Sequence, residues 1–231
     1  NDTKEYPMFM YVYGGPWRQT VQNQYDPLNG MWLQMLTNEY DMILLRVDNH
    51  GTDGRSEAFK KSTYGQMGKL ETRDQTEAAL ELSKRGYIDG NRIGIFGWSY
   101  GGYMASNCLF QSPEVFKMAI AVAPVTNWRF YDNIYTERYM GLPSENSAGY
   151  DADSPLSHVN GMSPNGKYML IHGTGDDNVH VQNSMRMVEA LVQADKDFKW
   201  FAYPDKNHGI SGGNSRMHLY RMMTNFIQEN L

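Results

Sequence analysis

The segment from Gly94 to Asn107, GIFGWSYGGYMASN, joins an apolar run to a helix-like run through a glycine-rich corner. Ser99 stands in this corner between two glycines, in the pattern Gly-Trp-Ser-Tyr-Gly. After a buried strand and before a helix of small residues, this pattern predicts a sharp connection that presents the serine hydroxyl at the helix N-terminus. The alternative is an ordinary glycine-rich turn, since chance gives the five-residue pattern roughly 0.13 times in a chain of this composition.

Apolar runs alternate with helix-length periodic segments on both sides of this corner. Strands are predicted at 6–15, 41–51, 92–98, 117–124, 167–173 and 198–204, and helices at 31–40, 72–86, from about 101, at 181–194 and at 214–230. This order predicts an α/β fold, a mostly parallel sheet with helices on both faces. The long excursion from Val125 to Pro164 lies between two strands, which favours an insertion near a functional site over a linker.

Composition narrows the class of protein. The chain has 231 residues, of which 41% are hydrophobic, enough for one large domain with its own core. The formal net charge is -5 and no run of basic residues occurs, so a nucleic-acid or anionic-membrane surface is not expected. The single cysteine, Cys108, excludes an internal disulfide.

A serine nucleophile needs a histidine base and an orienting carboxylate. In folds that present a serine at such a strand–turn–helix connection, the three catalytic residues follow one another along the chain as serine, acid and histidine. His208 lies between the last predicted strand and the last helix, at the same sheet edge as Ser99, and Asp176 and Asp177 both qualify as the acid. An activated serine requires neither a metal nor another cofactor. The alternative for this region is a metal site made of His172, Asp176, Asp177 and His180.

Four motifs occur in order along the chain: GWSYGGYM, NWRFYDNIYTERYMGLP, HGTGDDNVH and NHGI. Together they closely resemble the catalytic domain of the dipeptidyl-peptidase branch of the prolyl oligopeptidase family of serine peptidases, over essentially the whole chain. The resemblance implies an α/β-hydrolase fold in which Ser99 is the nucleophile, His208 the base and Asp176 the orienting carboxylate. It also implies that residues 1–231 lack the first strands of that fold and belong to a longer enzyme with a β-propeller.

The resemblance assigns further groups around the nucleophile. The hydroxyl of Tyr13 and the backbone amide of Tyr100 would stabilise the oxyanion, and Asn178 would contact a substrate carbonyl. For Tyr13, an ordinary buried strand tyrosine is the alternative. A proline pocket would be lined by Tyr100, Val125, Trp128, Tyr131, Tyr135 and Val179. Trp128, Tyr131 and Tyr135 are spaced so that one helix would place them on one face. The alternative for these three residues is a stripe that packs in the hydrophobic core.

The activity implied by the resemblance is the release of N-terminal Xaa-Pro or Xaa-Ala dipeptides through an acyl-enzyme. The resemblance also implies a homodimer and a periplasmic, secreted or cell-surface location. Three related activities remain open, namely an acylaminoacyl peptidase, a tripeptidyl peptidase and an esterase. A non-catalytic homologue used for binding is the alternative from another class of protein.

Overall fold

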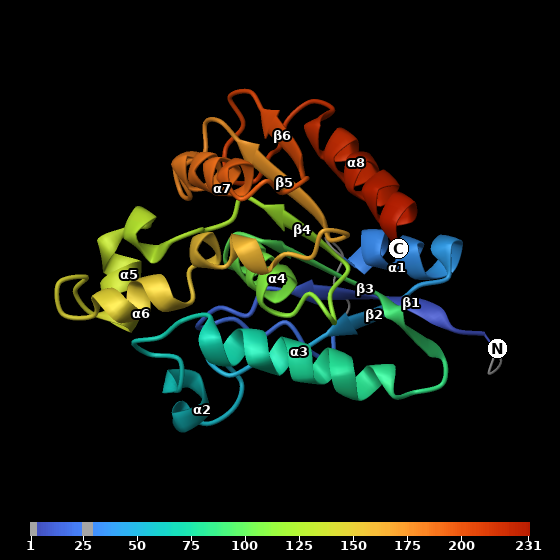
Figure 1. Ribbon diagram of the computed structural model, residues 1–231, viewed down its shortest axis with the longest axis horizontal. Coiled ribbons are helices and arrows are strands. Elements are labelled where there is room, and N and C mark those ends of the chain that lie inside the picture. Colours follow the sequence, from blue (N-terminus) through green and yellow to red (C-terminus); the bar gives the residue numbers. More distant parts are fainter. Residues whose placement is uncertain (1–3, 25–29) are drawn as a thin grey trace.

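The computed structural model describes residues 4–24 and 30–231. Its centre is a six-stranded sheet in the order β2-β1-β3-β4-β5-β6, and every neighbouring pair of strands is parallel (Figure 1). The strands are β1 Tyr6–Val12, β2 Ile43–Arg46, β3 Ile88–Trp98, β4 Met118–Val122, β5 Lys167–Gly173 and β6 Lys199–Tyr203. The sheet confirms the α/β architecture that the alternating apolar runs predict.

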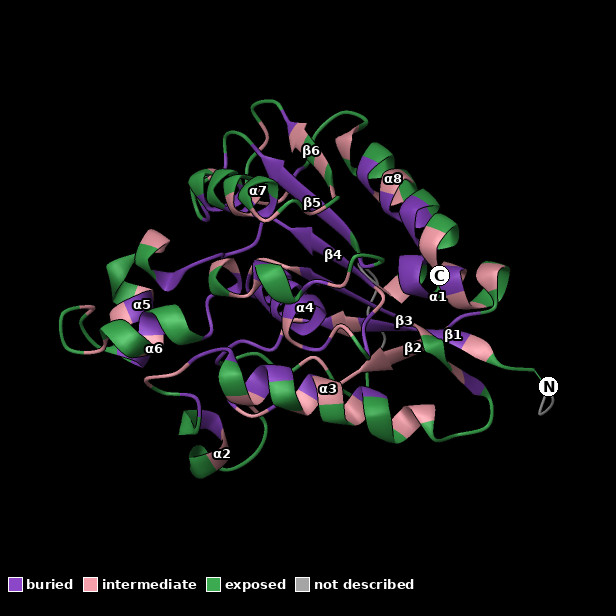
Figure 2. Ribbon diagram, viewed as in Figure 1, coloured by how far each residue is buried: buried purple, intermediate pink, exposed green. Residues whose placement is uncertain are grey.

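Helices cover both faces of the sheet because its strands are apolar on both sides. In β1, Met10 packs in the core on the side of α3, α4 and α7, whereas Phe9 packs in the core on the side of α1 and α8. Figure 2 shows the result, with β4, β5 and α4 buried along nearly their whole length. The helices are α1 Gly30–Tyr40, α2 Glu57–Lys61, α3 Lys69–Ser83, α4 Tyr100–Gln111, α5 Asn133–Met140, α6 Ser147–Ala152, α7 Gln182–Gln193 and α8 Ser215–Asn230.

Two parts of the chain differ from the sequence-based expectation. Helix α3 begins three residues before the predicted start at 72, because the amide of Gly68 at its N-cap is bonded by the Glu71 side chain. The excursion between β4 and β5 carries α5, α6 and three short 3-10 helices, so it is a folded subregion that begins at the carboxyl end of β4. The first of these 3-10 helices spans Trp128–Phe130.

The two edges of the sheet are β2 and β6. Within the described residues β2 pairs only with β1, and its four residues are all half-buried. That further strands precede β1 in a longer chain stays a prediction. In the part of the chain that the structure describes, no helix combines the length and the apolarity needed to cross a membrane.

Candidate active site

The corner after β3 holds Ser99 in a conformation that side chains seldom adopt. Ser99 has φ 61° and ψ -119°, directly before the first residue of α4. Its amide donates to the Val122 carbonyl at 2.8 Å, which fixes the corner to β4. A Cβ at Gly97 would lie 2.0 Å from the Gly101 carbonyl oxygen, and a Cβ at Gly101 would lie 2.2 Å from the Val12 carbonyl oxygen. Both glycines are therefore required for the tight connection, and the strained serine is typical of a functional position.

A histidine–carboxylate pair lies beside this corner. Nδ1 of His208 lies 2.7 Å from Oδ2 of Asp176, whose side chain is fully buried, while that of His208 is 24% exposed. A carboxylate only accepts hydrogen bonds, so Nδ1 of His208 carries the hydrogen and Nε2 is left as an acceptor. The indole of Trp98 donates to the His208 carbonyl at 3.0 Å, which ties the histidine loop to the residue before Ser99.

The surroundings of Asp176 favour its ionised form. Oδ1 accepts from the backbone amides of Asn178 and Val179, each at 3.0 Å. Nε2 of the buried His172 lies 3.2 Å from Oδ2 and 2.8 Å from the Val179 carbonyl oxygen. Burial alone would raise the pKa of Asp176, but the hydrogen bonds from both histidines and the Asn178 amide hold it well below its usual range. Asp176 is thus a carboxylate that stays charged and fixed in place.

Of the two acids that the sequence left open, the structure places Asp176 and not Asp177 at the imidazole. Asp177 is exposed in the loop after β5. No cluster of three or more histidine, cysteine, aspartate or glutamate side chains that could hold a metal ion occurs within residues 4–24 and 30–231.

The rings of Tyr13 and Tyr100 pack against each other next to the Ser99 corner. Their ring centroids are 6.0 Å apart, and Tyr13 is half-buried while Tyr100 is buried. Burial raises the pKa of Tyr13, although Arg18 nearby opposes the rise, so the hydroxyl stays protonated and can donate. This geometry is compatible with the predicted oxyanion role of Tyr13, which remains a prediction.

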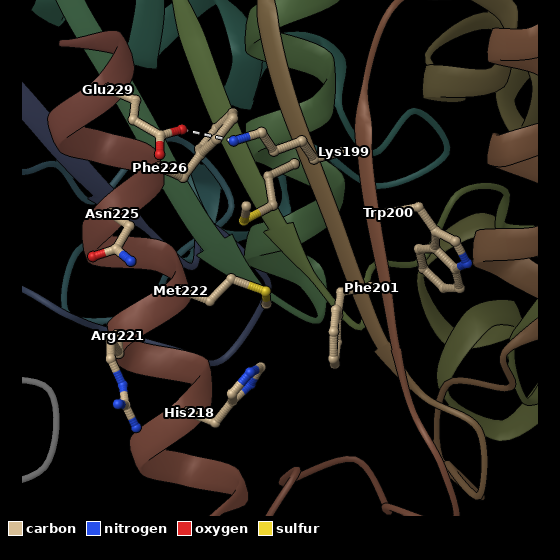
Figure 3. A pocket seen from close by; sticks show the side chains of 10 residues that line it. Lys199, Trp200, Phe201, His218, Arg221, Met222, Asn225, Phe226 and Glu229 are labelled. Atoms are coloured by element: carbon tan, nitrogen blue, oxygen red, sulfur yellow. Dashed lines mark hydrogen bonds and ion pairs between the residues drawn. The ribbon is translucent and has the colours of Figure 1, made fainter.

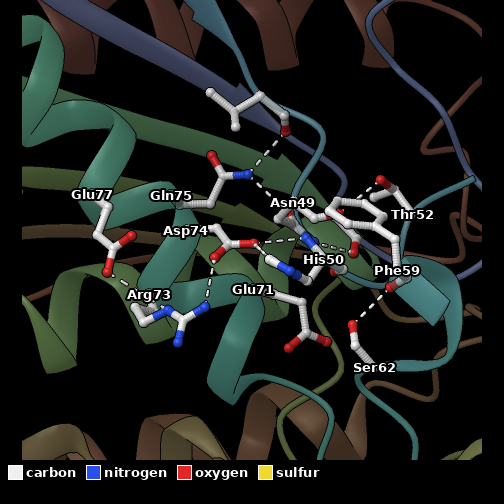
Figure 4. Close-up of polar contacts among 12 residues, drawn as sticks. Asn49, His50, Thr52, Phe59, Ser62, Glu71, Arg73, Asp74, Gln75 and Glu77 are labelled. Carbon is white, nitrogen blue, oxygen red and sulfur yellow. Dashed lines mark hydrogen bonds and ion pairs between the residues drawn. The ribbon is translucent and has the colours of Figure 1, made fainter. Parts of the chain in front are cut away.

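A buried polar network holds the loop that follows Tyr13 through the carbonyl of Gly14. Asn49 Nδ2 donates to the Gly14 carbonyl at 2.9 Å. Gln75 Nε2 donates to Asn49 Oδ1 and to the Val47 carbonyl, both at 2.9 Å (Figure 4). These contacts link helix α3 to the loop that carries the predicted oxyanion donor. Sequence reasoning missed them because the three partners lie far apart along the chain.

The predicted pocket residues gather into one aromatic cluster. The Trp128 ring lies 5.1 Å from that of Tyr100 and 5.9 Å from those of both Tyr131 and Tyr135, measured between centroids. Tyr131 donates to Asn178 Oδ1 at 2.6 Å, which joins the cluster to the loop after β5. Val125 and Val179 are both buried.

The three aromatic residues that one helix would place on one face do not share a helix. Trp128 belongs to the 3-10 helix Trp128–Phe130, Tyr131 is extended, and Tyr135 lies in α5. The break occurs because Asp132 caps α5, with its side chain accepting from the Tyr135 amide at 2.8 Å. The three rings therefore meet through a turn between two short helices.

A separate cavity lies at the other end of the sheet, between β6 and α8. It has a volume of about 600 Å³ and is lined by Lys199, Phe201, His218, Met222, Phe226 and others (Figure 3). Lys199 and Glu229 form an ion pair at its rim. None of its lining residues belongs to the predicted site, so the cavity is not part of the serine centre.

Comparison with known proteins agrees with this geometry. Residues 29–231 match the model of the prolyl oligopeptidase family. The chain is 42% identical to prolyl endopeptidase FAP of Mus musculus and 40% identical to dipeptidyl peptidase 4 of Felis catus. Each alignment covers 98% of this chain, which spans only 30% and 29% of those relatives.

A solved structure also matches over the whole chain. The crystal structure of Porphyromonas gingivalis dipeptidyl peptidase 4 superimposes with a TM-score of 0.95 at 43% identity, covering 100% of this chain and 32% of that one. The parallel sheet and its helices thus have the α/β-hydrolase fold of a dipeptidyl peptidase catalytic domain. On the family match and these likenesses, the chain belongs to the prolyl oligopeptidase family.

Proposed function

We propose that this chain is the catalytic domain of a serine exopeptidase that releases Xaa-Pro or Xaa-Ala dipeptides from the N-termini of peptides. The observation that carries the proposal is the 2.7 Å contact between His208 and the buried Asp176, fixed beside the strained Ser99 corner. A base held in one tautomer next to a serine at a helix N-terminus supports acyl transfer. The names of the relatives, dipeptidyl peptidase 4 and prolyl endopeptidase, support a peptide substrate.

The reaction follows from the proposed roles. Ser99 Oγ attacks the carbonyl carbon of the bond to be cleaved, and its proton passes to Nε2 of His208. The oxyanion that forms accepts hydrogen bonds from the Tyr100 amide and the Tyr13 hydroxyl. The carbon–nitrogen bond then breaks, and the leaving amine takes the proton from His208. Water repeats the sequence on the ester, which frees the dipeptide and restores Ser99.

The aromatic cluster suits a small cyclic residue. Trp128, Tyr131 and Tyr135 offer flat apolar faces to a pyrrolidine ring, and the tyrosine hydroxyls can meet its polar neighbours. Asn178, bonded to Tyr131 Oη, would face the carbonyl of the residue before proline. The charged amine of a dipeptide unit would be bound outside this chain, by acids of the predicted propeller.

Substrates with free and blocked N-termini distinguish the two activities named among the relatives. The full-length protein should release chromophore from Gly-Pro-p-nitroanilide and not from its N-acetylated form. We expect Tyr135→Ala to lower the preference for proline over bulkier residues, because it enlarges the pocket. Steady-state kcat/KM for the free and the blocked Gly-Pro substrates separates the two activities, and kcat/KM for matched substrates with proline or a bulkier residue measures the effect of Tyr135→Ala. Faster cleavage of the blocked substrate would indicate an endopeptidase, and unchanged proline selectivity in the variant would assign the cluster to packing.

Tyr13→Phe tests the oxyanion assignment. The hydroxyl would act on charge that develops only in the transition state, so we expect kcat to fall by about 10²–10³ while KM changes little. The phenylalanine ring keeps the contact with Tyr100, so the fold should be retained. Steady-state kinetics and thermal unfolding measure the two effects. An unchanged kcat would return Tyr13 to a packing role.

The remaining expectations from the resemblance belong to the same proposal. They are a homodimer, an exported location and a propeller domain in a longer protein to which residues 1–231 belong. The acylaminoacyl, tripeptidyl and esterase alternatives would each appear in the same assay as activity on their own chromogenic substrates. Loss of all activity with an unreactive Ser99 would favour the binding homologue.

A further inference from the structure

A fully buried carboxyl group lies behind the predicted site. Glu71, in the first turn of α3, has no solvent exposure. Its Oε2 accepts from the Gly68 amide at 2.9 Å, and its Oε1 accepts from the Tyr100 hydroxyl at 2.8 Å. Within residues 4–24 and 30–231, no basic side chain forms an ion pair with it. Burying an ionised carboxylate without a cation beside it costs free energy, so glutamate at a fully buried position is unusual.

The partner of Glu71 is the residue that follows the proposed nucleophile. The Tyr100 ring lies against the backbone of Gly15 and between the rings of Tyr13 and Trp128. Its hydroxyl is fixed by Glu71 at the far end. Tyr100 is thus held along its whole length, between the loop of one oxyanion donor and the wall of the pocket. A shift of this side chain would move the amide at the start of α4.

We infer that Glu71 is a positioning residue of the peptidase reaction, which holds Tyr100 through its hydroxyl and must stay uncharged to do so without opposing the oxyanion. The inference rests on the proposed function, because it concerns the same oxyanion site. Figure 4 shows Glu71 and Gln75 on the same helix, one turn apart. Gln75 supports the Tyr13 loop through Asn49, so α3 supports both predicted oxyanion donors.

Burial of Glu71 favours the neutral acid, in which Oε2 still accepts from the Gly68 amide and the protonated Oε1 shares its hydrogen bond with the Tyr100 hydroxyl, where either group can donate. Burial raises its pKa to about 8, although hydrogen bonds from its own amide, the Gly68 amide and the Tyr100 hydroxyl oppose the rise. The titratable groups that face it are Tyr100 and Tyr103 from α4 and Asp153 after α6. Asp153 Oδ2 is itself buried without a hydrogen-bond partner in the described structure, and it raises the pKa of Glu71 further. Burial raises the pKa of Asp153, whereas Lys69 and His158 lower it.

The rate at which a fluorophosphonate labels the full-length protein tests the inference. This reagent carries no amine that titrates and no proline that must fit the pocket. Its reaction rate therefore depends on the nucleophile, the base and the oxyanion donors alone. Glu71→Ala should slow labelling roughly tenfold to 100-fold, because about 1 Å of misplacement can cost 10²-fold. Glu71→Gln should be at least about tenfold faster than Glu71→Ala, since an amide still bonds the Gly68 amide and the Tyr100 hydroxyl. The matched control is Glu77→Gln, an exposed position on the same helix.

The pH profile separates positioning from simple packing. Labelling of the unmodified protein should decline as the pH rises through about 8, because Glu71 then ionises at the Tyr100 hydroxyl and its negative charge opposes the oxyanion that forms at the Tyr100 amide. Glu71→Gln cannot ionise and should lose this decline, whereas Glu77→Gln should keep it. An alkaline decline that persists in Glu71→Gln, or its absence from the unmodified protein, would overturn the inference.

A second variant covers the case in which Glu71→Ala does not fold. Tyr100→Phe keeps the ring and removes only the hydroxyl that Glu71 holds, so labelling should slow in it as well. A wild-type rate in Tyr100→Phe, or in folded Glu71→Ala, would overturn the inference. A protein that labels normally but does not cleave Gly-Pro substrates would contradict only the proposed specificity. The labelling rates of the Glu71 variants would still test the role of Glu71.

Discussion

Ser99→Ala is expected to abolish turnover, with kcat falling by about 10⁶. Loss of the serine in a comparable triad costs about 2 × 10⁶, and what remains comes from the oxyanion donors and binding. The change leaves Cβ and the backbone in place, so substrate affinity and unfolding temperature should stay near those of the unmodified protein. Mass spectrometry after fluorophosphonate treatment should find the adduct on Ser99 of the unmodified protein and none on the variant.

Ser99→Gly should lose the same activity and gain stability. With φ 61° and ψ -119°, Ser99 occupies a region that glycine enters without steric cost. Relief of such strain is worth about 1 kcal/mol or more in unfolding free energy, so this domain should melt at a higher temperature. A label on another serine, or an active Ser99→Ala protein, would remove Ser99 from the mechanism. A glycine variant no more stable than the alanine variant would show that the corner stores no strain.

The strands and the corner could be read from the sequence because their signals are local. The apolar runs that became β3 and β4 need no distant partner to be recognised, and Gly97 and Gly101 flank Ser99 within five positions. His208 follows from chain order alone, since a loop after a parallel strand faces the same edge as the corner. These features explain why the fold could be predicted and why Ser99 and His208 could be expected beyond the same ends of the parallel strands.

The support behind the site could not be read in the same way. Glu71 stands among the charged residues of an amphipathic helix, where a glutamate is normally exposed. Its burial depends on Tyr100, which lies 29 positions away, and no local pattern encodes that contact. Likewise His172 has the appearance of a strand-end residue, yet it touches the carboxylate that holds the base. Long-range contacts of this kind require the assembled fold.

Asp176→Asn is expected to lower kcat by about 10⁴, as in a comparable triad in which the same change traps the wrong tautomer. Oδ1 of Asp176 accepts from the amides of Asn178 and Val179, so an asparagine would keep its oxygen there. Its NH₂ group would then face His208 Nδ1 and donate to it. The imidazole would carry its hydrogen on Nε2, where it cannot accept the proton of Ser99.

Asp177→Asn is the matched control for this change, because it makes the same substitution at the next position of the same loop. Asp177 is exposed and Asp176 has a fully buried side chain, so the control should keep kcat within about threefold. His172 sharpens the contrast, because its Nε2 lies 3.2 Å from Asp176 Oδ2 and would face a second donor in Asp176→Asn. Steady-state kinetics with thermal unfolding of both variants measures the difference. If Asp177→Asn were the inactive protein and Asp176→Asn the active one, the orienting carboxylate would be Asp177, and the 2.7 Å contact at His208 would be structural only.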